Sequence, residues 1–216
     1  EGYRTWWSLR SRFAAMEQEG IDVQMGFPTN GIAAVSTSIK DAKLQAALVR
    51  AFNNWATDYC HDSDGKVLFV AMITMLDVNE AVLEAKRMVE HPEAAAVMLP
   101  ELSGELVWSN PEFDSLWNVL QDDGMAAAFH GGSSQSLRFS NFMGPLRSVS
   151  HAMAFPMDAM LAMGTLIFGG VLERFPKLRC SFLESNAGWV PFWLGRLDDH
   201  AVGRQDHYSR DSHLSL

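Results

Sequence analysis

Two side chains that can bind a metal ion or move a proton stand at the ends of apolar segments. His130 ends the segment Met125–His130 (MAAAFH), and Glu184 directly follows the segment Leu178–Leu183. A carboxylate in line with an apolar strand is costly to bury unless another group pairs with it. The carboxyl ends of parallel strands are also where α/β folds place their chemistry. Metal binding and acid–base catalysis are therefore the functions that these two residues indicate.

The roles of these residues stay open at the level of sequence. Glu184 has three equal readings, namely a metal ligand, a general acid or base, or a carboxylate paired with an arginine across the site. His151 precedes an apolar helix and, because histidine titrates near neutral pH, it could carry a proton or contact a substrate. A helix-capping or surface role for His151 is an equal alternative. His130 alone cannot hold a catalytic zinc, since about three protein ligands and a water are the usual minimum.

Short apolar strands alternate with amphipathic helices along the chain. Asp77 is expected to cap a helix, Pro156 to begin one and Asn186 to cap another, while the glycine- and serine-rich stretch 131–150 is expected to be a long loop. The strands are expected at Ile21–Phe27, Val67–Ile73, Ala94–Leu99, Met125–His130 and Leu178–Leu183, and the helices at Tyr3–Glu19, Asp41–Tyr59, Val78–Glu90, Asn110–Gln121, Pro156–Phe175 and from Asn186 through Leu197.

This alternation predicts an α/β fold with parallel strands, as in the middle of a (β/α)8 barrel or most of an open doubly wound sheet. No glycine-rich phosphate loop follows any strand, so nucleotide binding is disfavoured. The spacing favours the barrel over the open sheet. We expect a single barrel domain over residues 1–200 and a polar tail over 201–216 that contains His207 and His213.

Composition narrows the class of protein. The chain has 216 residues, 48% of them hydrophobic, which suffices for one sizeable core. Its net charge of −9 argues against nucleic acid and against an anionic membrane as a partner. Only Cys60 and Cys180 are cysteines, as is typical of a reduced intracellular protein, so we expect a cytoplasmic location. No uninterrupted apolar run is long enough to span a bilayer.

Several sequence blocks resemble the amidohydrolase superfamily, in the branch that includes aminocarboxymuconate-semialdehyde decarboxylase and related aromatic-acid decarboxylases and hydrolases. The blocks are GIDVQMGFPT, NNWATDYC, PEFDSLW, FHGG and LIFGGVLERFPKLRCSFLESNAGWVPFWLGRLDDH. The resemblance implies a metal-dependent (β/α)8 barrel. It also implies metal-site residues in a fixed pattern, with a His-x-His pair on the first strand, a histidine on each of the fifth and sixth, and an aspartate on the eighth.

Only part of that pattern is found in this chain. His130 matches the fifth-strand metal ligand, and Glu184 stands where the sixth strand usually carries a histidine. No His-x-His pair occurs, and no strand is expected after Asp199. We therefore expect strands two to six of a barrel, without strands one, seven and eight. The chain would then be a fragment, a portion of a longer protein, or a natural remnant that closes its sheet in another way.

The resemblance implies a divalent-metal hydrolase or carboxy-lyase (non-oxidative decarboxylase) acting on a small carboxylated substrate that is cyclic or aromatic. Zinc is the expected metal, with manganese as the second choice. The alternative is a non-catalytic truncated barrel that pairs with another chain. Two apolar edge strands would be exposed in an incomplete barrel. We therefore expect a homo-oligomer, or completion by further chain segments, rather than an isolated monomer.

Overall fold

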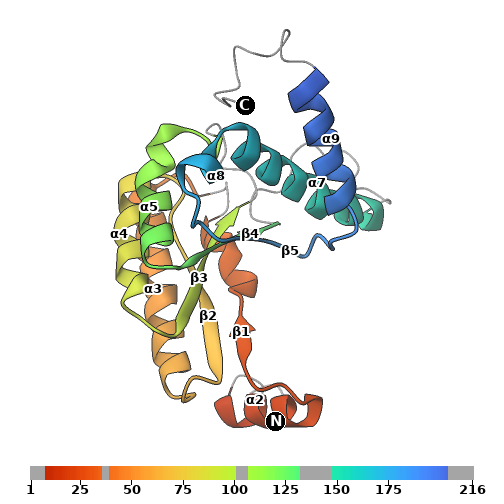
Figure 1. The fold of residues 1–216 in the computed structure, drawn as a ribbon. Coiled ribbons are helices and arrows are strands. Elements are labelled where there is room, and N and C mark those ends of the chain that lie inside the picture. The colour runs from red at the N-terminus through yellow and green to blue at the C-terminus, as the bar shows by residue number, and fades with distance from the viewer. Residues whose placement is uncertain (1–7, 36–38, 101–106, 132–146, 204–216) are drawn as a thin grey trace.

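A computed structural model describes residues 8–35, 39–100, 107–131 and 147–203. In this part of the chain, five strands form one sheet in the order β1-β2-β3-β4-β5, and every neighbouring pair is parallel. The sheet curls into half of a barrel with helices around it (Figure 1). The predicted parallel α/β arrangement is confirmed. The strands are β1 (Gln24–Gly26), β2 (Val67–Met72), β3 (Ala94–Pro100), β4 (Ala126–His130) and β5 (Cys180–Leu183).

The helices follow the strands in the predicted alternation. Asp77 accepts hydrogen bonds from the first backbone amides of α4, as expected. Asp41 caps α3 in the same way, and Gly20 ends α2 in the left-handed conformation. In the described residues no helix is both long and apolar enough to cross a membrane. The helices are α2 (Leu9–Glu19), α3 (Ala42–His61), α4 (Val78–Val89), α5 (Asp114–Asp122), α7 (Arg147–Phe168), α8 (Val171–Arg174) and α9 (Val190–Gly203), with short 3₁₀ segments η1 (Thr29–Val35) and η2 (Pro111–Phe113).

The predicted start of the helix before β5 is wrong. α7 begins at Arg147, within the stretch expected to be a loop, and Pro156 is its tenth residue rather than its first. A proline inside a helix leaves the carbonyl four residues earlier without its partner. That residue, Ala152, is exposed, so solvent can satisfy the carbonyl. At the other end, Gly170 takes the left-handed conformation and separates α7 from α8, where one continuous helix was expected.

Other element boundaries also differ from the sequence expectation. β1 is shorter than Ile21–Phe27, and the segment after it forms η1 instead of an open loop. α9 begins at Val190, so Asn186 lies outside it in the left-handed conformation and does not cap it. The remainder of the long stretch, residues 132–146, lies outside the described residues, as do His207 and His213.

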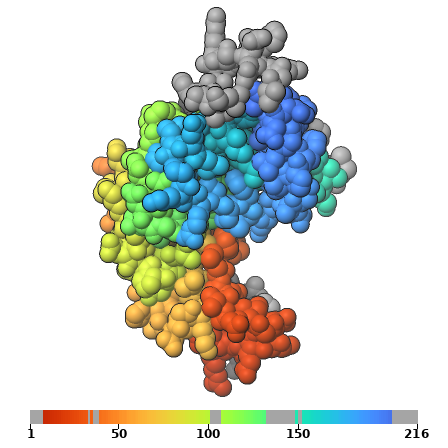
Figure 2. Space-filling view, in the orientation of Figure 1, coloured from red at the N-terminus to blue at the C-terminus, as the bar shows by residue number. Residues whose placement is uncertain are grey.

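Side chains on the sheet separate into two apolar clusters, one on each face. The outer cluster, between the sheet and the helices, includes Phe69, Val97 and Phe129. The inner cluster, on the concave face, includes Met72 and Ala128. Because strand side chains alternate between faces, the residue after Phe129 points to the concave face. Figure 2 shows a hollow between α2 and α9, on the side where the barrel is open.

Buried polar side chains of α3 hold the carboxyl end of β2. Pairing between β1 and β2 ends at Phe69, so the later residues of β2 lack a strand partner on that side. Asn53, fully buried, replaces it by donating to the Met72 carbonyl and accepting from the Met72 amide. Asn53 also donates to Glu84 of α4. Burial acts to raise the pKa of Glu84, but hydrogen bonds from Arg87 and Asn53 outweigh it and hold this pKa below its ordinary value.

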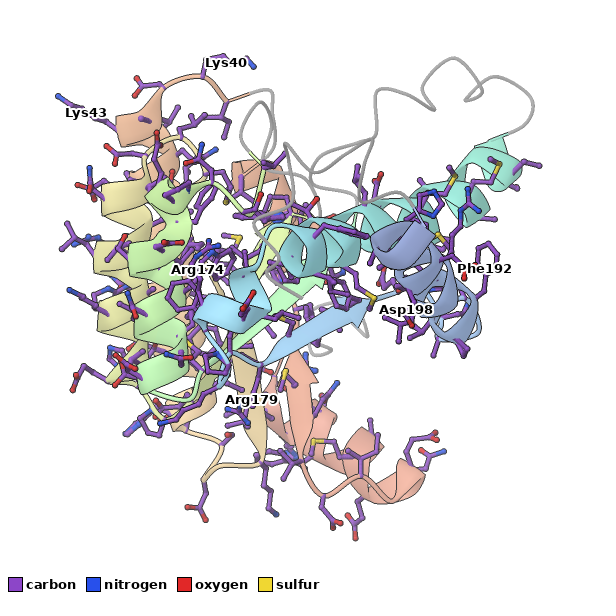
Figure 3. The ribbon with its side chains drawn as sticks, turned by 45° about the horizontal axis from the view of Figure 1, so that its top comes forward. Lys40, Lys43, Arg174, Arg179, Phe192 and Asp198 are labelled. Atoms are coloured by element: carbon purple, nitrogen blue, oxygen red, sulfur yellow. The ribbon has the colours of Figure 1, made fainter. Side chains whose placement is uncertain are left out.

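Polar contacts of Arg174 join the end of α7 to α5. Arg174 donates to the Gly169 carbonyl at 2.8 Å and to Asp114 Oδ1 at 3.0 Å. Figure 3 shows Arg174 beside α5, with whose Asp114 it forms this ion pair. Gly169, just after α7, lies against Ser109. A Cβ atom on Gly169 would overlap with Ser109 Cβ, so the close approach of these two residues requires glycine.

We predict that Asn53→Ala lowers the free energy of unfolding by at least about 2 kcal/mol. The change leaves the backbone amide and carbonyl of Met72 without a buried partner, and each such group costs about 1–3 kcal/mol. Asn54→Ala is the matched control because Asn54 is exposed and bonds only to Arg87 among the described residues. Urea unfolding of both variants measures the difference, and equal midpoints would contradict the proposed role of Asn53.

We predict that Gly169→Ala destabilises the fold by about 1–3 kcal/mol, the usual range for overpacking. Gly195→Ala is the control, since a Cβ at Gly195 meets nothing within 4 Å. Alanine inside a helix is favoured over glycine by about 0.5–1 kcal/mol, so this control should be slightly stabilised. The thermal unfolding temperatures of the two variants should therefore shift in opposite directions. A stabilised Gly169→Ala variant would contradict the close approach of Gly169 to Ser109.

Candidate metal and acid–base site

His130 lies on the concave face at the carboxyl end of β4. Its strand register pairs it with Pro100 on one side and Leu183 on the other. The residue is 8% exposed, and its Nδ1 lies 2.6 Å from the Gly131 carbonyl. A carbonyl oxygen only accepts, so Nδ1 carries a proton in this contact. In the neutral ring, Nε2 therefore keeps its lone pair, which is the form of histidine that binds a metal ion.

Glu184 follows β5 and meets His130 across the strand ends. Its Oε1 lies 3.6 Å from His130 Nε2, and its side chain is 59% exposed. Strict alternation would have placed Glu184 on the helix-facing side with Phe182, which packs against the outer cluster. Instead, Glu184 has φ of 56°, in the left-handed region, and this interrupts the alternation. The expected penalty for burying this carboxylate does not arise, because Glu184 remains largely in solvent.

The described contacts of Glu184 bear on the three roles considered for it. Among the described residues its ion-pairing partner is His130, and no described arginine pairs with it. The choice among the three roles stays a prediction. His151 lies in the first turns of α7, but its side chain is outside the part that the structure describes. Its role as a proton carrier or substrate contact therefore stays a prediction.

The distance between the two donors suits a shared metal ion. Nitrogen and oxygen ligands at about 2.0–2.2 Å from a tetrahedral zinc are about 3.4 Å apart, close to the 3.6 Å separation of His130 Nε2 and Glu184 Oε1. Within the described residues, no group of three or more histidine, cysteine, aspartate or glutamate side chains could hold a metal. These two residues thus fit part of a ligand set, and a catalytic site would need further ligands from elsewhere.

Phe27 is a site neighbour that the sequence reasoning did not single out. It follows β1 directly, and its ring centroid lies 5.7 Å from that of His130, with the planes tilted by 36°. The signal in the sequence was its place at the carboxyl end of an expected strand. Nothing in the sequence, however, indicated that this end lies next to His130 of β4, which two strands separate from β1 in the sheet.

The family of this chain follows from its match to a protein-family model. A family model described as amidohydrolase matches residues 2–210. The chain belongs to the amidohydrolase family. The resemblance drawn from its sequence blocks is thereby confirmed. Comparison with curated protein sequences gives no significant match.

Solved structures share the fold of this amidohydrolase chain. The 5-carboxyvanillate decarboxylase LigW of Sphingomonas paucimobilis is 20% identical, with a TM-score of 0.75, over 95% of this chain and 59% of that one. An amidohydrolase of Mycobacterium avium subsp. paratuberculosis is 21% identical, with a TM-score of 0.78, over 95% and 55%. A 5-carboxyvanillate decarboxylase of Novosphingobium aromaticivorans, solved with manganese and 4-hydroxy-3-methoxy-5-nitrobenzoic acid, is 19% identical, with a TM-score of 0.75, over 95% and 58%. The chain therefore spans a little over half the length of these structures.

We predict that Glu184→Gly raises the free energy of unfolding by about 1 kcal/mol and weakens metal binding by the intact protein. Glycine removes the left-handed strain, which costs other residues roughly 1–2 kcal/mol, but it also removes an oxygen donor. Asp64→Gly is the control, because Asp64 is also left-handed but lies in the turn before β2, at the opposite end of the sheet. It should gain similar stability and bind metal unchanged, as measured by unfolding and calorimetric titration. Undiminished metal affinity in Glu184→Gly would remove Glu184 from the ligand set.

Proposed function

We propose that the protein to which this chain belongs is a metal-dependent hydrolase or non-oxidative decarboxylase of a small aromatic carboxylate. The observation that carries this proposal is the approach of His130 Nε2 and Glu184 Oε1 to 3.6 Å on neighbouring strands of an amidohydrolase fold. The decarboxylases among the similar structures act on aromatic acids, as their names state, and this supports the choice of substrate class.

His130 and Glu184 would contribute to holding a divalent metal ion, which would polarise a substrate oxygen or activate water. Zinc is the first candidate because imidazole and carboxylate both bind it at about 2.0–2.2 Å. Manganese is the second candidate because carboxylate oxygen suits it, and one similar structure contains manganese. His130 would act through Nε2, since Nδ1 is engaged with the Gly131 carbonyl.

Glu184 would have a different task in each reaction if it serves as the acid or base. In a decarboxylation, its carboxylic acid form would give a proton to the ring carbon, and that carbon would then release its carboxylate as CO₂. In a hydrolysis, its carboxylate form would take a proton from the attacking water. Its exposure allows the proton to exchange with solvent after either step. His151 is proposed as a further proton carrier or substrate contact.

A second candidate function is a partial barrel that associates with other polypeptide. The exposed flank of the sheet favours it, because Ile21, Val23 and Met25, in and before β1, are 44–55% exposed. Apolar edge strands of this kind recruit partner strands. The partner would be further segments of the protein or a second copy, as in a homo-oligomer. For location we propose the cytoplasm, because Cys60 and Cys180 are both free.

We predict that the purified intact protein contains stoichiometric zinc or manganese by mass spectrometry, and that His130→Ala loses it while remaining folded. The change removes the Nε2 ligand without disturbing the outer cluster. His61→Ala is the control, because His61 is exposed, ends α3 and pairs with Glu93 away from the site. It should keep the metal. CO₂ release from hydroxybenzoates would then identify a decarboxylase, whereas a protein without metal would support the partial-barrel function.

A further inference from the structure

Phe27 is half-buried on the concave face, and it takes part in neither metal binding nor acid–base catalysis as proposed above. Its side chain packs against the inner cluster, and its ring is in aromatic contact with His130 at 5.7 Å. The two residues come from β4 and from the end of β1, so the contact joins distant parts of the sheet. Packing against the inner cluster and the pairing of β1 in the sheet therefore hold Phe27 in place, next to the proposed reacting centre.

The concave face around this contact is otherwise aliphatic. Its buried side chains in the described residues are alanine, valine and methionine: Val35, Val49, Val70, Met72, Ala96, Met98 and Ala128. One other aromatic ring packs there, that of Phe52, which belongs to α3 and contacts Trp55. Among the described residues, Phe27 is thus the carbon ring that lies next to His130.

We propose that Phe27 forms the ring-recognising wall of the substrate site and favours planar aromatic carboxylates over saturated cyclic ones. The inference rests on the proposed function and deepens it by assigning the residue that reads the substrate's ring. A carboxylate bound near His130 Nε2 and Glu184 Oε1 would direct its ring towards Phe27, whose own ring centroid lies 5.7 Å from that of His130. Aromatic pairs attract at centroid separations of about 4.5–7 Å in offset or edge-to-face geometry, beyond the area that they bury. Phe27 would act by positioning the substrate and would take no part in bond making.

The test compares two ligands of nearly equal size and charge, benzoate and cyclohexanecarboxylate. Their binding to the intact, metal-loaded protein is measured by calorimetry for the wild type and for Phe27→Leu, which keeps an apolar side chain but removes the ring. Benzoate binding should weaken about two- to twelvefold, the range expected for losing one aromatic contact. Cyclohexanecarboxylate binding should stay within about twofold. Phe52→Leu is the control, because the Phe52 ring packs against the inner cluster and its aromatic contact among the described residues is with Trp55; it should not change the ratio of the two affinities.

Three outcomes would overturn the inference. If Phe27→Leu weakens both ligands equally, Phe27 contributes apolar packing and not ring recognition. If benzoate binding is unchanged, Phe27 does not line the site. If the variant loses its metal, Phe27 orients His130 instead. A metal-loaded wild type that binds neither compound would refute the proposed substrate class itself, and the wild-type measurement separates that failure from the first three.

Discussion

The two-residue alternation of side chains along β4 is the constraint on which the site depends. Phe129 is buried in the outer cluster between the sheet and the helices, and this fixes the rotation of the strand. The next residue, His130, must then face the concave side. A slip of one residue would bury the imidazole among helix side chains and expose Phe129, at a cost of apolar burial and of an unpaired polar ring. The packing of the outer face thus determines the position of the metal-ligand candidate.

Glu184 reaches the same point by breaking this rule. Alternation along β5 would direct it towards the helices, and the left-handed conformation brings its carboxylate to His130 instead. Such a conformation costs a residue other than glycine roughly 1–2 kcal/mol. Sparsely populated conformations of this kind tend to occur at functional sites, where the surrounding structure enforces them. The pairing of a strained backbone with a carboxylate facing a histidine is more specific than either feature by itself.

The helices keep the strand ends in place through a few polar contacts. Asn53 completes the hydrogen bonding of β2 where β1 has already ended, and Arg174 ties the end of α7 to α5. Asn53 thus bonds the backbone groups of β2 that have no strand partner on that side. Arg174 bonds a carbonyl at the end of α7 and pairs with a carboxylate of α5. Hydrophobic packing positions the two layers, and the Asn53 contacts hold the carboxyl end of β2, at the end of the sheet where the candidate site lies.

The sequence by itself determined the parallel α/β fold, the family, the order of the strands and the cap at Asp77, because these depend on local periodicity and short-range hydrogen bonds. It also marked His130 and Glu184 as strand-end residues. It missed the course of α7 through Pro156, since the exposure of Ala152, whose carbonyl Pro156 leaves without a helical partner, is a tertiary property. Only the tertiary structure brought Phe27 to His130 and turned Glu184 towards it. Those approaches depend on sheet curvature and on a backbone conformation that no local pattern specifies.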